Sequence, residues 1–125
     1  MSPKLDTTLC EKYPKIFAHR HIDSTIIGGR GFECGDGWYD LIDLLCHNLQ
    51  GETDHNGGPQ AVADQVKEKF AGLRFYAHGV NDRMLGMITM AETFSHAICD
   101  VCGNRGKTVE RKGVHLTRCV NHEYV

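Results

Sequence analysis

The chain has 125 residues, of which 41% are hydrophobic and 24% are charged, and its formal net charge is -2. These values lie near the globular average, so a fibrous repeat and a fully disordered chain are excluded. The length allows one ordinary domain, or a small core with a metal-stabilised appendage. No run of roughly eighteen apolar residues occurs, and no apolar segment follows a basic start, so we expect neither membrane association nor export, and a cytoplasmic location.

The six cysteines are expected in a reducing compartment, where thiols serve as metal ligands or core residues more often than as disulfides. Cys10, Cys34 and Cys46 are irregularly spaced, and we interpret them as core thiols. A second metal site stays open as an alternative. A catalytic cysteine would need a nearby base, and Cys34 with His19 or His47 is the pair to test.

Near the N-terminus, Asp6 is expected to cap a short helix that ends at Pro14. Residues 16–33 mix β-branched residues with glycines, which predicts an extended segment followed by a flexible loop. Within that segment His19, His21 and Asp23 form an HxHxD run, and a strand would point all three side chains the same way. A metal-dependent nuclease or hydrolase uses such a cluster, although we prefer to interpret these histidines as structural or solvent-exposed.

The clearest predicted helix follows Asp36 and ends near Gly51, with its acidic side chains, including Asp40 and Asp43, on the exposed face. Its apolar stripe consists of Trp38, Leu41, Ile42, Leu45, Cys46 and Leu49. We expect Trp38 in the core and a mobile polar connector over residues 51–59.

A β-hairpin is predicted over residues 62–76, because apolar residues lie on both sides of Ala71 and Gly72. Asn81 then caps a second amphipathic helix that leads into Cys99. The stripe of this helix consists of Met84, Met87, Ile88, Ala91, Phe94, Ser95 and Ile98.

Two knuckles near the C-terminus predict one structural zinc ion, bound by Cys99, Cys102, Cys119 and His122. Each pair of ligands is separated by two residues, which lets both side chains converge on one ion. Four protein ligands close the coordination shell, whereas a catalytic zinc site keeps a position open for water. We therefore expect the ion to fold the tail, since a small hairpin buries too little apolar area to fold alone.

The residues between the knuckles are expected to form a hairpin that turns near Lys112 and Gly113. We expect a zinc ribbon rather than a treble clef, because residues 123–125 are too few to form the helix that follows the second knuckle of a treble clef. The hairpin is basic, which allows direct nucleic-acid binding as an alternative to a solvated surface. Its candidate contact residues are Arg105, Lys107, Arg111, Lys112 and Arg118. The acidic helix, with Asp36, Asp40 and Asp43, is the other candidate surface, since carboxylates can imitate a row of phosphates.

Three segments, residues 33–46, 65–76 and 91–103, resemble a family of small phage and prophage proteins without assigned activity, and the resemblance extends to both knuckles. It implies a mobile-element origin. Small phage accessory proteins often bind and disable host machinery, including defence nucleases such as CRISPR complexes. The resemblance therefore implies that the chain acts on a host protein or nucleoprotein complex in the host cytoplasm through a binding surface for this partner. It assigns no catalytic residues to this sequence.

These patterns together predict an α+β protein in which two amphipathic helices pack on a β-hairpin, followed by a C-terminal zinc ribbon. Residues 1–98 form the predicted core with its N-terminal extension, and residues 99–125 form the zinc module. The expected function is non-enzymatic binding of a host protein or nucleoprotein complex, with inhibition as a consequence. A metal-dependent hydrolase and a nucleic-acid-binding ribbon are the alternatives.

Overall fold

The computed structural model of the chain describes residues 1–21 and 31–124. Its elements, with η for short 3-10 helices, are α1 (Pro3–Lys12), η1 (Ala18–His21), β1 (Phe32–Glu33), η3 (Asp36–Trp38), α2 (Tyr39–Asn56), β2 (Val62–Lys69), β3 (Gly72–His78), α3 (Asp82–Ser95), β4 (Lys107–Arg111) and β5 (Val114–Arg118). The predicted mixture of helices and strands is confirmed.

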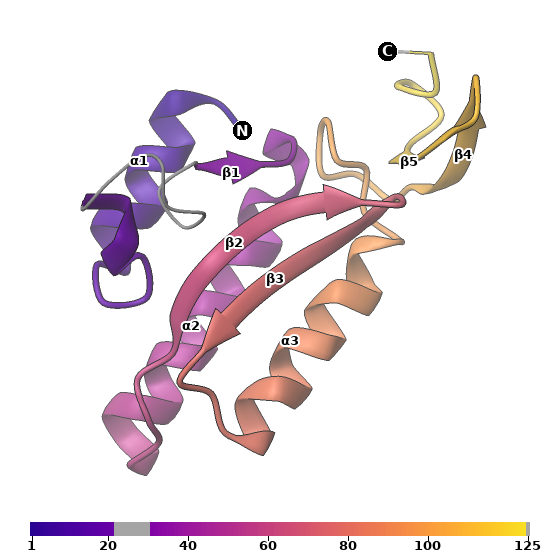
Figure 1. Cartoon of the computed structure of the whole chain (residues 1–125). Coiled ribbons are helices and arrows are strands. Elements are labelled where there is room, and N and C mark those ends of the chain that lie inside the picture. Colours follow the sequence, from indigo (N-terminus) through magenta and orange to yellow (C-terminus); the bar gives the residue numbers. More distant parts are fainter. Residues whose placement is uncertain (22–30, 125) are drawn as a thin grey trace.

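The long, curved pair β2 and β3 is the centre of the fold, with α2 and α3 side by side against it (Figure 1). The core lies between these elements and includes Trp38, whose predicted burial is confirmed at 0% exposure. Its other fully buried large side chains include Leu9, Ile16, Ile42, Leu49, Leu73 and Met84. Apolar burial of this extent is the main stabilising contribution in a domain of this size.

The main sheet has the strand order β1-β2-β3. β1 runs parallel to β2, with Phe32 opposite Val66, and β2 runs antiparallel to β3, with Val66 opposite Phe75. The free edge of β3 is covered by α3, because Ser95 Oγ and Glu92 Oε2 each accept a hydrogen bond from a β3 backbone N–H at 2.9 Å. Covering an edge in this way satisfies its donors and prevents pairing with other chains.

The turn between β2 and β3 places two non-glycine residues in the left-handed region, Phe70 at φ 51° and Ala71 at φ 71°. This conformation matches the twist of a two-residue hairpin but is unfavourable for residues with a Cβ. Tertiary contacts hold it in place. Glu68 Oε1 accepts a hydrogen bond from Ala71 N at 3.3 Å, and Thr117 Oγ1 donates one to Ala71 O at 2.6 Å.

α2 extends beyond its expected end at Gly51 and terminates at Asn56, so the expectation of a polar connector over residues 51–59 was wrong for its first part. Gly51 has open space around its Cβ position and is tolerated inside the helix. The helix is instead capped at its C-terminus by Gly57, whose φ of 73° is the left-handed conformation that glycine adopts most readily.

The N-terminal segment also differs from its expected form. α1 begins at Pro3, a residue favoured in the first helical turn, and Asp6 lies inside the helix and does not cap it. Residues 18–21 form the short helix η1, so the expected strand was wrong there, while residues 22–30, with Gly28 and Gly29, lie outside the described part. Phe17 anchors this segment by packing edge-on against Phe32 and Phe75.

Candidate metal centre and exposed surfaces

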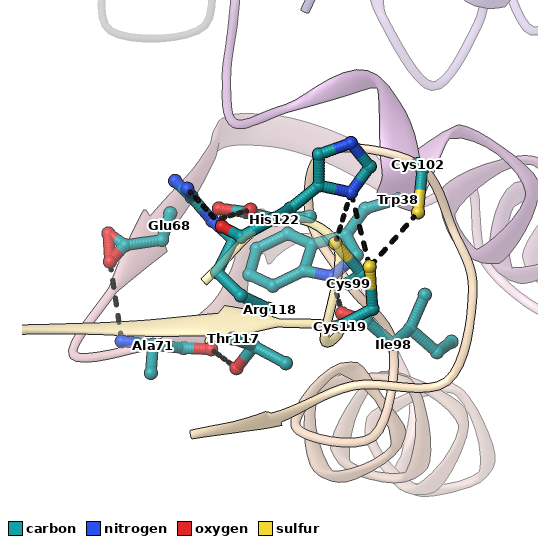
Figure 2. Close-up of polar contacts among 11 residues, drawn as sticks. Trp38, Glu68, Ala71, Ile98, Cys99, Cys102, Thr117, Arg118, Cys119 and His122 are labelled. Atoms are coloured by element: carbon teal, nitrogen blue, oxygen red, sulfur yellow. Dashed lines mark hydrogen bonds and ion pairs between the residues drawn. The ribbon is translucent and has the colours of Figure 1, made fainter. Parts of the chain in front are cut away.

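The four predicted zinc ligands come together where α3 leads into the β4–β5 hairpin. Figure 2 shows the three cysteine side chains and the imidazole of His122 pointing toward one another. Their ligand atoms all lie within 4.8 Å of one another. Both knuckles turn by local backbone hydrogen bonds, from Gly103 N to Cys99 O at 2.9 Å and from His122 N to Cys119 O at 3.1 Å.

Two of these ligand-atom distances match those around a tetrahedral ion, and the third is shorter. Cys102 Sγ lies 3.7 Å from Cys119 Sγ, and His122 Nδ1 lies 3.7 Å from Cys99 Sγ and 3.1 Å from Cys119 Sγ. Zinc bound to sulfur and nitrogen at its usual bond lengths places such atoms about 3.6 to 3.8 Å apart. The donor set and its spacing are therefore compatible with a metal site.

The surroundings of Cys99 favour its thiolate form, which can bind a cation. Its burial raises the thiol pKa, but backbone N–H groups of Cys119, Cys102 and Val101 point at the sulfur and together lower the pKa to about 6. At neutral pH the thiolate is then the main form, and the thiolate is the form that ligates a metal. Cys99 and Cys119 are buried, whereas Cys102 is exposed.

The first knuckle packs tightly against η3, directly before α2. Gly37 N donates to Asp100 O at 2.9 Å, and the indole Nε1 of Trp38 donates to Ile98 O at 2.8 Å (Figure 2). A Cβ on Gly37 would lie only 2.1 Å from Cys99 O, so this contact requires glycine. The four candidate ligands are thus held by the same core that buries Trp38.

The basic hairpin presents most of its charges to solvent. Arg105, Lys107 and Lys112 are exposed. Arg111 is half-buried, with its guanidinium 5.5 Å from the Tyr124 ring. Arg118 is not an exposed contact residue, because its Nε lies 2.6 Å from Asp100 Oδ1 and both side chains are nearly buried.

The three acidic candidates have different surroundings. Asp40 is exposed on α2. Asp36 is also exposed and accepts a hydrogen bond from Ser2 N at 2.6 Å. Asp43 is partly covered and binds the Tyr13 hydroxyl at 2.6 Å and Lys12 Nζ at 2.7 Å, so its charge is already neutralised within the chain.

The predicted HxHxD cluster is described only in part, since Asp23 and the side chain of His21 lie outside the described residues. His19 meets two residues that the sequence interpretation missed, Asp64 and His78. No local motif indicates them, because they lie on β2 and β3, and only the folded sheet brings them to His19.

The remaining cysteines behave as thiols of the interior. Cys10 and Cys46 are buried, and Cys34 is half-buried. Burial raises the pKa of all three, that of Cys34 to about 12, so none is activated as a nucleophile.

An exposed groove between α2 and α3 was not predicted. It has a volume of about 390 Å³ and is lined mainly by leucine, methionine and phenylalanine. Leu44, Met90 and Phe94 are 63%, 64% and 57% exposed. The expected burial of Phe94 was therefore wrong. The signal in the sequence is the surplus of apolar residues, Leu44, Leu85 and Met90, beside the predicted stripes.

The chain matches no protein-family model, no curated protein and no solved structure. Its function is therefore inferred from its own residues. Within residues 1–21 and 31–124, none of the helices has both the length and the apolar character needed to cross a bilayer.

Proposed function

We propose that this chain is a non-enzymatic binding protein, stabilised by one structural zinc ion, whose groove between α2 and α3 binds a cationic amphipathic helix of a partner. The exposed apolar groove is the observation that carries this proposal. The zinc ion supports it indirectly, because a closed Cys3His shell contributes folding free energy and leaves no position for substrate or water. In this proposal β4 and β5 form the ribbon that the ion stabilises.

The lining of the groove is typical of surfaces that bind helices. Leu41, Leu44, Met87, Met90 and Phe94 place flexible and aromatic side chains along two neighbouring helices. Amphipathic helices insert apolar residues at helical spacing into such grooves, and methionine adapts to their shape. An exposed apolar patch of this kind is uncommon on a protein that acts alone.

The charged residues of the two helices that form the groove favour a basic occupant. α2 has no lysine or arginine. The single arginine of α3, Arg83, forms an ion pair with Glu52, with its Nε 3.3 Å from Glu52 Oε2. Asp43, Glu52 and Glu92 on these helices already have partners within the chain, whereas the carboxylates of Asp40, Asp54 and Asp82 are exposed. A helix with an apolar face and lysines or arginines beside it therefore complements this surface.

The resemblance to phage and prophage proteins leads us to place this partner in a host cell, as a protein or a nucleoprotein complex. Occupation of the groove would then inhibit the partner if its basic helix normally contacts nucleic acid. The exposed carboxylates of α2 would take the place of phosphates in that contact.

The test uses two synthetic helical peptides with leucines at helical spacing, one carrying lysines and the other glutamates at the remaining positions. Fluorescence anisotropy is expected to show binding of the lysine peptide only. Phe94→Asp and Met90→Asp each place a charge in the groove and should weaken binding at least tenfold, or about 1.4 kcal/mol.

Leu85→Asp is the matched control, because Leu85 is exposed on the same helix but does not line the groove. It should leave the affinity unchanged. Equal losses in all three variants, or equal binding of the glutamate peptide, would refute the proposed occupant. A wild-type dimer that Phe94→Asp converts to a monomer, as seen by sedimentation, would assign the groove to a second copy of the chain instead.

Direct nucleic-acid binding by β4 and β5 is the second candidate. It is favoured by the exposure of Arg105, Lys107 and Lys112 on one short hairpin. We expect any such binding to weaken steeply with added salt and to be reduced by Lys107→Ala and Lys112→Ala. An affinity for a nucleic acid that neither salt nor these substitutions changes would exclude this hairpin as its binding surface.

A further inference from the structure

A second cluster of metal-binding side chains lies far from the cysteines in the sequence. It consists of His19 on η1, Asp64 on β2 and His78 at the end of β3. One ligand atom from each residue lies within 4.8 Å of the other two. His78 Nδ1 and Asp64 Oδ1 are 2.8 Å apart, and the two imidazole ring centroids are 5.8 Å apart.

The fold places these three residues together by identifiable means. The register between β2 and β3 shifts between Ala63 and Gln65, so Asp64 lies at a β-bulge. Bulges redirect a side chain and occur often beside functional sites. The η1 helix lies against β2, and the residues just before it are held there by the hydrogen bond from Ala63 N to Ile16 O, at 2.8 Å.

His19 has an unsatisfied polar atom. Its Nδ1 is buried and has no hydrogen-bond partner among the described residues. A buried nitrogen without a partner costs roughly 1 to 3 kcal/mol, and native structures seldom leave one unexplained. A bound cation, or a water molecule that the cation carries, would supply the missing interaction.

We propose that His19, Asp64 and His78 bind a divalent transition-metal ion of the zinc class. Two imidazoles and one carboxylate are the ligands that such ions prefer over magnesium or calcium. Three protein ligands leave coordination positions to water, as catalytic zinc sites do and the Cys3His centre does not. The side chains of His78 and Asp64 are 57% and 41% exposed, so the ion is accessible to solvent and binds more weakly than zinc at the cysteines.

This site is independent of the proposed groove and of the cysteine centre. It changes the interpretation of the HxHxD run, because His19 finds its partners on the sheet. It also places an ion with open positions at a surface where a substrate or a phosphate group could approach it.

Cobalt(II) distinguishes the two centres by spectroscopy. The full chain is first loaded with one equivalent of zinc, which the cysteines retain, and is then titrated with cobalt. The second ion is expected to give weak visible bands without the intense thiolate-to-cobalt charge transfer of a cysteine site. Elemental analysis after buffer exchange gives the number of zinc and cobalt ions per chain.

Asp64→Asn and His78→Ala should each weaken the second ion at least tenfold and leave the zinc at the cysteines in place. Asp64→Asn preserves side-chain size, so an unchanged circular dichroism spectrum would show that the loss of the ion comes from the missing carboxylate and not from misfolding. His115→Ala and His47→Ala are the controls, because both histidines are exposed on other elements, β5 and α2. Failure to bind cobalt beyond the first site, or equal losses in the control variants, would overturn the proposal and leave His78 and Asp64 as a hydrogen-bonded pair.

Discussion

The carboxylate of Asp43 links α2 to the N-terminal segment. Partial burial raises its pKa, but hydrogen bonds from Lys12 and Tyr13 have the larger combined effect, so the pKa lies below its ordinary value. The same contact, together with burial, raises the pKa of Tyr13. Asp43, which the sequence suggests as a binding residue on the surface, therefore has a structural role.

We predict that Asp43→Asn lowers the free energy of unfolding by about 1 kcal/mol at pH 7, the usual contribution of such hydrogen bonds. Because the folded pKa is depressed, this contribution is present above the unfolded pKa of about 4 and is lost as pH falls through the folded value. Urea unfolding of both proteins from pH 7 to pH 3 measures it.

The difference between wild type and Asp43→Asn should therefore shrink in acid. Loss of metal at low pH affects both proteins and cancels in this difference. Asp40→Asn, an exposed neighbour on α2, serves as the control and should leave stability unchanged at each pH. A difference that stays constant down to pH 3 would contradict a role for the ionised carboxylate.

At the scale of elements, the first knuckle lies in close backbone contact with residues 35–37, which lead through η3 into α2. Gly35 and Gly37 meet the carbonyl groups of Asp100 and Cys99, and a Cβ at either glycine would lie within 2.1 Å of a carbonyl oxygen. Side chains cannot relieve such overlap, because both partners are backbone. A displacement of the first knuckle therefore also displaces the residues that contain Gly35 and Gly37.

We predict that Gly37→Ala lowers the free energy of unfolding by roughly 2 kcal/mol, the typical cost of overpacking. Gly51→Ala is its matched control, since Gly51 lies inside α2 with open space around it. That change should raise stability by about 0.5 to 1 kcal/mol through helix propensity. Urea midpoints of the two variants give the comparison, and a Gly37→Ala protein as stable as the wild type would show that the knuckle is not packed against η3.

At the scale of the whole molecule, the β4–β5 hairpin is connected to the core at several points. Thr117 donates to the β2–β3 turn at Ala71, and Trp38 donates to Ile98 just before the first ligand. The sequence predicts a core over residues 1–98 and a zinc module over residues 99–125, and the Thr117 contact joins these two units. Because of these contacts, we expect removal of the metal to change the structure of the core as well as that of the hairpin.

Metal removal by a chelator, or by Cys102→Ser, tests this coupling. Cys102 is exposed, so serine leaves the packing intact and removes only a ligand. We expect the bound zinc to fall from one ion per chain to none and the β4–β5 hairpin to unfold. Trp38 is the only tryptophan, and its emission should shift because its hydrogen bond to Ile98 loosens.

Cys34→Ser is the control for this experiment and should keep both zinc and the Trp38 emission unchanged. A hairpin that unfolds while the emission of Trp38 stays constant would show that the core and the zinc module are independent. Zinc that the chain still binds when Cys102→Ser is combined with Asp64→Asn, which removes a ligand of the second proposed site, would contradict the assignment of the four ligands.

Local patterns in the sequence indicated much of this protein. The spacing of Cys99, Cys102, Cys119 and His122 identified a candidate metal centre, because knuckle geometry depends on neighbouring residues alone. Helical periodicity located α2 and α3, and the Asn81 cap is confirmed by its hydrogen bond from Met84 N at 2.9 Å. The end of α2 was missed, since an isolated Gly51 inside a helix looks like a terminator.

Contacts between distant residues were decided only by the tertiary structure. The grouping of His19 with Asp64 and His78 depends on strand register and a bulge, and the pairing of Arg118 with Asp100 depends on how the hairpin docks. The groove likewise arises because α2 and α3 pack side by side and leave Phe94 uncovered. Sequence periodicity specifies which face of a helix is apolar, but packing determines how much of that face remains open to a partner.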